Sequence, residues 1–396
     1  MDASIYYHIP VCNIIYQPKL VINELTREEI MKIQEFLESP ISALPKERRE
    51  SDYLNYLENI FKAYTDGLQQ IENTGLVADN ILKNVYSCVK IATSILSSAT
   101  RYFNGHPSDA YEELKKGVEE ILPFALKLVA KSADKDYLRN LYRIRIKEDK
   151  AFDKKDMFHI PYELRHLVAT QRYSIPGFPS LYLGSSIYIA WREMGCPDLN
   201  TTVITRVEAQ DNVKVLDFAY VPQYEADFFS RLATMPRTSM GLIEEQFIAR
   251  LICWPLIAAC SIKVMNKKGS FKPEYIIPQI LLQLLRNNVI GDDIDGIRYF
   301  STNADYDMPS MKIHTNFVFP VKDAKATGHC DQLSDKFFLT EPASWQLLNS
   351  IYEEPNYLHT PDASVQLIRG INTRYRSTDF ATIEARLIAL DASKVN

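Results

Sequence analysis

Residues that could bind a charged ligand or stabilise a developing charge gather in three short segments of the sequence. These segments are 141–145 (LYRIR), 171–193 (QRYSIPGFPSLYLGSSIYIAWRE) and 294–302 (IDGIRYFST). The first two supply arginines, and a planar guanidinium group can bind phosphate oxygens through two parallel hydrogen bonds. The second ends in Glu193, and a fixed carboxylate stabilises positive charge on a sugar ring. The third supplies Ser301, whose hydroxyl can donate or accept a hydrogen bond.

The order of these segments resembles the signature of the RES family. In that signature, an arginine and an aromatic residue precede a Pro-Gly turn, a short strand with a tyrosine, and a helix that carries a glutamate. The matching positions are, in order, Arg172, Tyr173, Pro176, Gly177, Leu181, Tyr182, Ala190 and Glu193. The family's opening strand with its arginine is matched to Arg143, and its late strand with its serine is matched to Ser301. The resemblance covers about residues 138–320.

The resemblance implies a fold related to the ADP-ribosyltransferases and an activity that breaks the bond between nicotinamide and ribose in NAD⁺. NAD⁺ would then be the substrate, with inorganic phosphate or water as the acceptor, and no cofactor or metal is expected. Breaking this bond builds positive charge on the ribose while a neutral base departs. A carboxylate beside the anomeric carbon therefore stabilises the transition state.

The resemblance also implies a role for each matched residue. Glu193 is the candidate for the catalytic carboxylate, with Arg143 and Ser301 as the other catalytic candidates. Arg143 and Arg172 would bind the pyrophosphate, because guanidinium groups match its oxygens in a way that lysine cannot, or one of the two would instead hold an attacking phosphate. Tyr182 would stack on the nicotinamide and hold it in an orientation that allows departure.

Two of these positions have alternatives. Arg145 is a rival to Arg143, because side chains two residues apart on a strand share a face, and motif order alone favours Arg143. Tyr299 shares a strand face with Ser301 and is a further substrate-binding candidate. The sequence also departs from the family, since residues 170–174 read TQRYS where the family usually has Gly-Gly-Arg-Trp-Asn.

Each candidate residue also has an ordinary structural interpretation. Taken alone, Glu193 would be a solvated helix residue, and Arg143 would be a surface residue on an edge strand. Tyr182 would belong to the core, and Ser301 would be a hydroxyl at the end of a strand. Their occurrence in the order of the family favours the functional interpretation, most of all for Glu193 and Arg172.

The composition excludes several other classes of function. The chain has 396 residues, 46% of them hydrophobic, and a net charge of −5, so no overall basic field would attract nucleic acid or anionic lipid. The longest uncharged apolar stretch, 251–262, is too short to span a bilayer, and the N-terminus lacks the pattern of a secretory signal. We therefore expect a cytoplasmic protein that binds neither nucleic acid nor a membrane.

The cysteines indicate the same compartment. They are widely scattered, with no Cys-x-x-Cys pair and no cluster of His and Cys at zinc-ligand spacing. Their positions are Cys12, Cys88, Cys196, Cys253, Cys260 and Cys330. We expect free, buried thiols, as is usual in a reducing environment.

The first part of the chain, to about residue 131, has a helical pattern. Thr26 and Glu29 stand at the spacing of a capping box. Apolar residues at three-to-four spacing across 81–99 predict a long amphipathic helix, and a second helix should begin at Ser108 and Asp109. A short loop joins the two helices, which should pack as an antiparallel hairpin within a bundle.

Residues 132–156 are rich in charge, and we place a domain boundary there, with a helical domain at 1–131 and a second domain at 132–396. Strands are expected at 180–183, 201–209, 213–218, 296–301 and 316–320, and helices at 186–194, 240–264, 273–287 and, in a C-terminal extension, 378–390. This irregular order predicts an α+β fold, with an N-terminal α-helical bundle followed by a mixed domain that resembles the RES fold.

The helical part contains a second motif. Arg101 and His106 have the Arg-x4-His spacing of HEPN ribonucleases, in which histidine acts as an acid or base on an RNA 2′-hydroxyl. Gly105 and Pro107 place His106 in a loop between two helices. HEPN-like helical domains are known beside RES domains, so the resemblance can hold for the fold without the ribonuclease chemistry.

Three hypotheses follow from the sequence. The leading one is an NAD⁺ phosphorylase or glycohydrolase that acts as a toxin or defence effector by depleting NAD⁺. The second is a ribonuclease that acts through Arg101 and His106. The third is a non-catalytic module that senses NAD⁺ or a related nucleotide. Small RES toxins pair with an antitoxin that plugs the active site, so an antitoxin or regulatory protein is a candidate partner, as is a second copy of the chain bound through the helical bundle.

Overall fold

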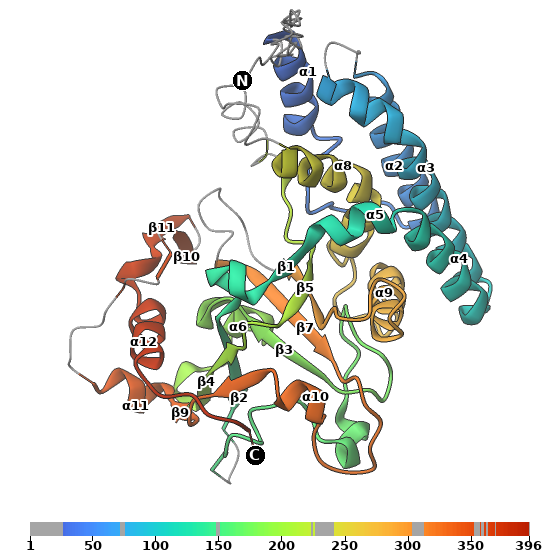
Figure 1. Cartoon of the computed structure of the whole chain (residues 1–396). Coiled ribbons are helices and arrows are strands. Elements are labelled where there is room, and N and C mark those ends of the chain that lie inside the picture. The colour runs from blue at the N-terminus through green and yellow to red at the C-terminus, as the bar shows by residue number, and fades with distance from the viewer. Residues whose placement is uncertain are drawn as a thin grey trace, which may run out of the picture.

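Figure 1 shows the computed structural model of the chain, with helices in its upper part and a sheet below them. The structure describes residues 27–71, 76–147, 151–222, 225, 241–302, 313–351, 357, 360–361, 363–368 and 370–395. Thr26 of the expected capping box and Cys12 therefore lie outside the described residues.

The first part of the described chain is helical, as the sequence predicts. Its helices are α1 (Arg27–Glu38), α2 (Tyr53–Gln69), α3 (Leu76–Phe103), α4 (Pro107–Glu120) and α5 (Leu122–Ala125). The predicted hairpin of α3 and α4 is confirmed, and Gly105 turns the chain between them with a φ of 83°. The two helices approach closely at Gly117, because a Cβ there would lie 2.4 Å from the Cβ of Ser94.

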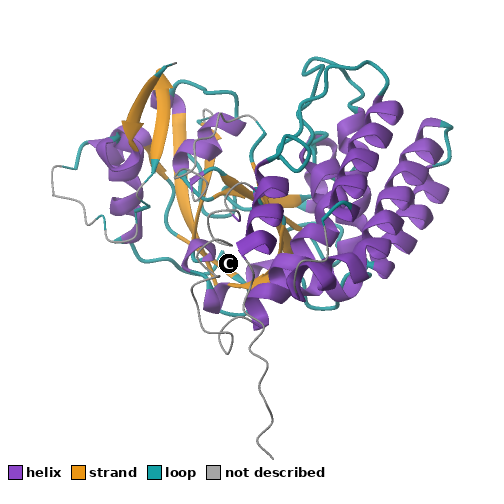
Figure 2. Cartoon of the chain, turned by 90° about the horizontal axis from the view of Figure 1, so that it is seen from above, coloured by secondary structure: helices purple, strands orange, loops and turns teal. Residues whose placement is uncertain are grey.

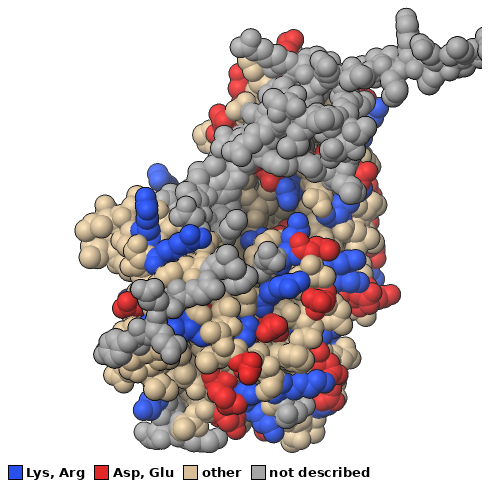
Figure 3. Space-filling view, turned by 60° about the vertical axis from the view of Figure 1, so that its left-hand side comes forward, with Lys and Arg blue, Asp and Glu red and all other residues tan. Residues whose placement is uncertain are grey.

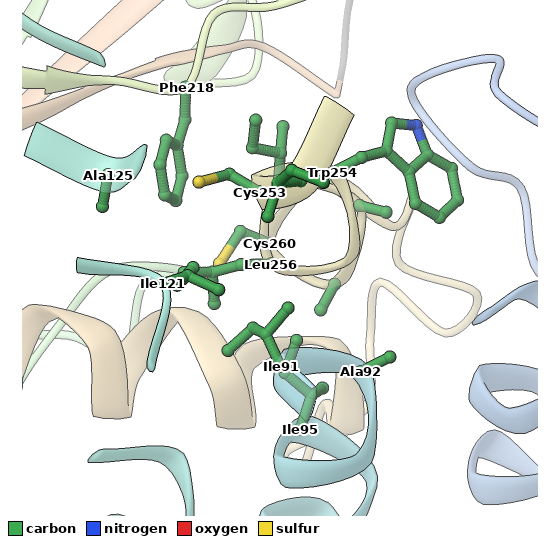
Figure 4. Packing of buried hydrophobic residues seen from close by; sticks show 14 of the residues in the cluster. Ile91, Ala92, Ile95, Ile121, Ala125, Phe218, Cys253, Trp254, Leu256 and Cys260 are labelled. Carbon is green, nitrogen blue, oxygen red and sulfur yellow. The ribbon is translucent and has the colours of Figure 1, made fainter. Parts of the chain in front are cut away.

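Two helices from later in the chain complete this helical layer. They are α8 (Gly241–Ser261) and α9 (Ile276–Arg286), which the sequence predicts at 240–264 and 273–287. The indole of Trp254 on α8 stacks on the ring of Tyr64 on α2 at 3.8 Å, and both side chains are fully buried. Figure 4 shows Trp254 and Cys253 of α8 in the same apolar cluster as Ile91 of α3.

The helical layer is thus one core built from residues before and after the expected boundary at 132. A buried ion pair joins the two parts as well, since the guanidinium of Arg48 lies 2.7 Å from the carboxylate of Glu274. The division into domains at 1–131 and 132–396 stays a prediction.

Strands from the middle of the chain form the sheet. They are β1 (Val129–Lys131), β2 (Asn140–Ile146), β3 (Ser180–Gly184), β4 (Thr202–Ala209), β5 (Lys214–Asp217), β6 (Gly296–Phe300), β7 (Thr315–Pro320), β8 (Phe337–Leu339) and β9 (Ala343–Ser344). Within the described residues the order is β1-β5-β6-β7-β3-β2-β4-β8, and β9 also pairs with β4. The β5 and β6 strands are parallel, and the other pairs described are antiparallel. The predicted α+β class is confirmed.

The two faces of the sheet pack against different partners. Leu181 and Leu183 of β3 and Phe317 of β7 share a core with Phe158. Alternate residues of a strand point to opposite faces, and Tyr182 packs against the helical core instead. Figure 2 shows helices gathered on both sides of the strands.

The C-terminal part adds a small layer beside the sheet. It contains α11 (Trp345–Asn349), the hairpin of β10 (Ser364–Ile368) and β11 (Ile371–Arg374), and α12 (Asp379–Ile388), whereas α10 (Asp331–Ser334) packs in the core with Phe158. The helix predicted at 378–390 is confirmed as α12. It shares an apolar core with α6 (Ile187–Glu193), the helix that follows β3.

Four of the described cysteines are buried and free, but the expectation of buried thiols is wrong for Cys196. This residue lies in the turn that ends α6, where the chain leaves the core with a φ of 58°, and its side chain is exposed. Among the described residues, no helix is long and apolar enough to cross a membrane. On the face shown in Figure 3, basic and acidic side chains are interspersed.

Candidate functional site

The α6 helix positions Glu193, which is its last residue. The helix begins directly after β3, and the side chain of Ser186 caps it by accepting a hydrogen bond of 3.0 Å from the backbone N–H of Ile189. A Cβ at Gly184 would lie 2.7 Å from Cγ2 of Ile189, so only glycine lets the helix pack this closely on the end of the strand.

Two buried side chains hold one carboxylate oxygen of Glu193. The hydroxyl of Ser301 donates to Oε1, and Nδ2 of Asn316 donates to the same oxygen at 2.9 Å. Ser301 is 1% exposed and Asn316 is 5% exposed, whereas Glu193 is exposed. The carboxylate is therefore fixed from the protein side at a place that a ligand can reach. Two of the residues predicted from the sequence, Glu193 and Ser301, are in direct contact.

Arg172 lies beside this pair. Its Nη2 donates to the hydroxyl of Thr302, the neighbour of Ser301, at 3.1 Å, and its Nη1 donates to the carbonyl oxygen of Cys260 at 3.2 Å. The guanidinium lies over the ring of Tyr275, 5.3 Å from its centroid. The positive charge of Arg172 and the carboxylate of Glu193 are thus anchored to consecutive residues of the chain.

Tyr299 interacts electrostatically with both the glutamate and the arginine. Burial raises the pKa of Tyr299 well above its usual value, and the negative charge of Glu193 raises it further while Arg172 opposes the shift. The ring of Tyr299 lies 4.6 Å from that of Tyr173, whose carbonyl oxygen accepts a hydrogen bond of 2.6 Å from the hydroxyl of Tyr182. Both Tyr299 and Tyr182 are half-buried.

Arg143 and Arg145 end in different surroundings. The Nη1 atom of Arg143 is 3.5 Å from the carbonyl oxygen of Tyr182, and burial lowers the pKa of Arg143 to about 10. Arg145 donates from Nη1 to the carbonyl oxygen of Asp156 at 2.6 Å and lies over the ring of Phe152. Of the two rivals, Arg143 is the one that lies next to a predicted site residue.

Their strand, β2, lies inside the sheet between β3 and β4, so the alternative of a surface arginine on an edge strand is wrong. β2 pairs with β3 only where Tyr142 faces Gly184. Beyond that bridge, Arg143 reaches across to the carbonyl of Tyr182.

Three residues of the site were not singled out from the sequence. Asn316 sits in the strand TNFVFP, Thr302 follows Ser301, and Tyr275 precedes α9. The signal for Asn316 was a lone amide among apolar strand residues, because a buried amide needs a hydrogen-bond partner. The contact of Tyr275 with Arg172 could not be predicted from sequence spacing, since only the packing of α9 brings the two residues together.

The residues of the HEPN-like motif lie elsewhere, where α3 ends and α4 begins. The backbone N–H of His106 donates to the carbonyl oxygen of Arg101 at 3.0 Å, and both side chains are exposed. His106 stands at the start of α4 without capping it through its side chain. The nearby ring of Phe103 packs against Phe271 at 5.8 Å.

A cavity of about 980 Å³ lies at a different place, between the ends of β2 and β4 and α12. Tyr142, Arg206 and Glu384 are among the residues that border it, and the residues around Glu193 described above do not. Arg206 is fully engaged there, because its guanidinium donates to the carbonyls at Leu387 and Leu390 and to two side chains.

The chain is similar to a protein of Bacillus subtilis (strain 168) named "Putative toxin YopC". The two are 32% identical over 360 residues, which cover 87% of this chain and 78% of that protein. An alignment of this extent includes helices of the first part as well as the sheet. No model of a protein family matches the chain, and no solved structure matches it.

Proposed function

The chain belongs to the family of the Bacillus subtilis protein YopC, whose name describes a toxin, and from this premise we propose that it is a toxin that cleaves NAD⁺. The bond that breaks joins nicotinamide to ribose. The observation that carries this proposal is the fixed carboxylate of Glu193, which Ser301 and Asn316 hold beside Arg172 and two half-buried tyrosines. The likeness to the RES signature supports the same chemistry.

The reaction needs a negative charge beside the anomeric carbon. When the C–N bond breaks, its electron pair leaves with the nicotinamide, which departs as a neutral base, and positive charge spreads over the ribose ring. The carboxylate of Glu193 stabilises that charge. An oxygen of phosphate or water then bonds to the anomeric carbon, and in the case of water a proton is released to solvent.

The other residues bind and orient. Arg172 would bind the pyrophosphate, and its contacts to Thr302 and Cys260 fix the plane of its guanidinium. Tyr299 or Tyr182 offers a ring for the nicotinamide. The hydroxyl of Ser301 donates to Glu193, so in the free protein it orients the carboxylate. Arg143, beside Tyr182, would hold either the pyrophosphate or an attacking phosphate.

The proposal is tested by incubating the purified chain with NAD⁺, with and without inorganic phosphate, and measuring released nicotinamide. We expect release, and the dependence on phosphate identifies the acceptor. NADH is the control substrate, because its uncharged dihydronicotinamide ring is a poor leaving group and should stay attached. An absence of nicotinamide under both conditions would contradict the proposal.

The two alternatives predict other results in the same experiment. A ribonuclease acting through Arg101 and His106 would degrade RNA, lose that activity in His106→Ala and keep it in Glu193→Gln. A sensing module would bind NAD⁺ without releasing nicotinamide. The ribonuclease has no structural observation of the kind that supports Glu193, because Arg101 and His106 are joined by a backbone hydrogen bond at the end of the α3–α4 hairpin, with both side chains exposed. The sensing module would use the same site as the proposed enzyme, so the release of nicotinamide decides between these two.

A further inference from the structure

A buried glutamate of the C-terminal helix holds the beginning of α6. Glu384 of α12 is 4% exposed, and its Oε1 accepts a hydrogen bond of 2.6 Å from the backbone N–H of Ile187, the first residue of α6. The same oxygen accepts a hydrogen bond of 2.5 Å from the hydroxyl of Tyr375. The first N–H groups of a helix have no partner within the helix, so Glu384 supplies one that water cannot.

Other contacts fix the same end of α6. The hydroxyl of Ser186 donates to the carbonyl oxygen of Ile313 at 2.6 Å, and Oγ of Ser185 accepts from the backbone N–H of Thr315 at 3.1 Å. These bonds join α6 to the segment that enters β7, the strand that also carries Asn316. Glu384 adds a hydrogen bond from α12, whose Phe380 also packs on Tyr188 and Trp191 of α6.

The helix between these ties and the site is short. It has seven residues, and a helix of this length is not stable by itself, so contacts at its ends set its direction. From Ile187 to Glu193 the rise is about 9 Å at 1.5 Å per residue. A tilt at the first turn is therefore carried to the carboxylate that Ser301 and Asn316 hold.

A glutamate is an unusual choice at such a buried position. Placing a carboxyl group there costs free energy that an apolar residue would not incur, unless its hydrogen bonds compensate. Burial raises the pKa of Glu384 to about 8, and the bonds from Tyr375 and Ile187 oppose this shift. The group thus stands in the core for its hydrogen bonds and not for its charge.

We propose that Glu384 is a positioning residue for NAD⁺ cleavage, which acts by fixing α6 and through it the carboxylate of Glu193. This inference rests on the proposed function of Glu193. It assigns a role in the chemistry to the C-terminal extension, because α12 and the segment with Tyr375 lie outside the part of the chain that resembles the RES signature.

Hydrogen exchange of the full chain tests the structural half of the proposal without any substrate. Glu384→Met keeps the length of the side chain but removes the acceptor, and Glu384→Gln keeps an acceptor oxygen. We expect amide exchange across 187–193 to rise about tenfold in Glu384→Met and to stay near the wild-type rate in Glu384→Gln. Leu387→Ala is the matched control, since it weakens the packing of α12, the helix that carries Glu384, without removing a hydrogen bond to α6.

The rate of nicotinamide release tests the catalytic half. Because misplacing a reacting group lowers the rate of the chemical step, kcat of Glu384→Met should fall about tenfold or more, with KM for NAD⁺ within about twofold of the wild type. Glu384→Gln should restore kcat. If Glu384→Met does not fold, Glu384→Ala is the second variant, with the same expectations.

The results separate the inference from the proposed function. Equal exchange in 187–193 for Glu384→Met and Leu387→Ala would overturn the role of Glu384, whatever the activity. An equal kcat for these two variants would overturn it as well. If the wild type releases no nicotinamide, the proposed function fails, and the positioning of the chemistry fails with it even if exchange shows that Glu384 fixes α6.

Discussion

At the scale of single residues, the site depends on hydrogen bonds that point one carboxylate in one direction. Ser301 and Asn316 both donate to Oε1 of Glu193. Glu193, Ser301 and Arg172 were singled out from the sequence because their order resembles a known signature, and the structure places them close together. Asn316, Thr302 and Tyr275 could not be predicted, because their contacts with these residues arise from the pairing of β6 with β7 and the packing of α9.

The role of Asn316 leads to a first prediction. Removing its amide in Asn316→Ala should lower kcat for nicotinamide release about tenfold to hundredfold, because the carboxylate loses a fixed orientation, while KM for NAD⁺ changes little. Asn200→Ala is the matched control, since Asn200 is an exposed residue whose side-chain oxygen accepts a hydrogen bond from Gln346 at 3.4 Å. A kcat equal to that of the control would show that the amide does not orient Glu193.

The guanidinium of Arg172 leads to a second prediction. Arg172→Lys keeps the charge but loses the planar pair of donors, so KM for NAD⁺ should rise about tenfold with a smaller change in kcat. The control is Arg286→Lys, because Arg286 also lies over an aromatic ring, that of Phe178, and donates to the carbonyl of Val321. An unchanged KM in steady-state assays would remove Arg172 from the binding of the substrate.

At the scale of elements, the short helix α6 connects the C-terminal layer to the site. The strand and helix on either side of Gly184 follow from the sequence, since two leucines and a tyrosine precede the glycine and a serine cap follows it. The strands β1, β8 and β9 were not predicted, because two or three residues cannot show the alternation by which a strand is recognised. The tie from α12 to α6 could not be predicted either, because 197 positions separate Ile187 from Glu384.

The buried acid of α12 makes the stability of the fold depend on pH. Burial raises the pKa of Glu384 from 4.5 to about 8, and the groups that face it are the hydroxyls of Tyr375 and Tyr142. The folded state therefore holds a proton that the unfolded state releases above pH 4.5. The stability due to this proton is complete below that pH and is lost as the pH rises through 8.

We expect Glu384→Gln not to lose this stability as the pH rises, because its amide does not titrate. Between pH 5 and pH 9, the free energy of unfolding of the wild type should fall, relative to that of Glu384→Gln, by on the order of a few kcal/mol. Denaturant unfolding at a series of pH values measures the difference. Parallel curves for the two proteins would mean that Glu384 is ionised in the fold at neutral pH.

At the scale of the whole molecule, one helical core contains segments from both sides of the expected boundary. From Leu251 onward the α8 helix is apolar on all sides, which indicates burial but does not reveal which helices surround it. Its contact with α3 and the stack of Trp254 on Tyr64 belong to the tertiary fold alone. The antiparallel hairpin of α3 and α4, in contrast, was predictable because a short loop leaves neighbouring helices few other arrangements.

This shared core leads to a prediction for stability. Trp254 is fully buried, stacks on Tyr64 at 3.8 Å, and donates from Nε1 to the carbonyl oxygen of Ser42 at 2.7 Å. Trp254→Ala should lower the free energy of unfolding by about 3–5 kcal/mol, because it leaves a cavity and an unpaired carbonyl. Calorimetry that finds the same unfolding temperature as the wild type would contradict the packing of α8.

The central claim is that the carboxylate of Glu193 stabilises the charge that forms on the ribose of NAD⁺. The most direct test compares nicotinamide release by the wild type, by Glu193→Gln, and by Glu119→Gln, in which an exposed glutamate of α4 is changed in the same way. We predict that Glu193→Gln reduces kcat about hundredfold or more and that Glu119→Gln has the wild-type rate. Equal rates for all three proteins would contradict the account.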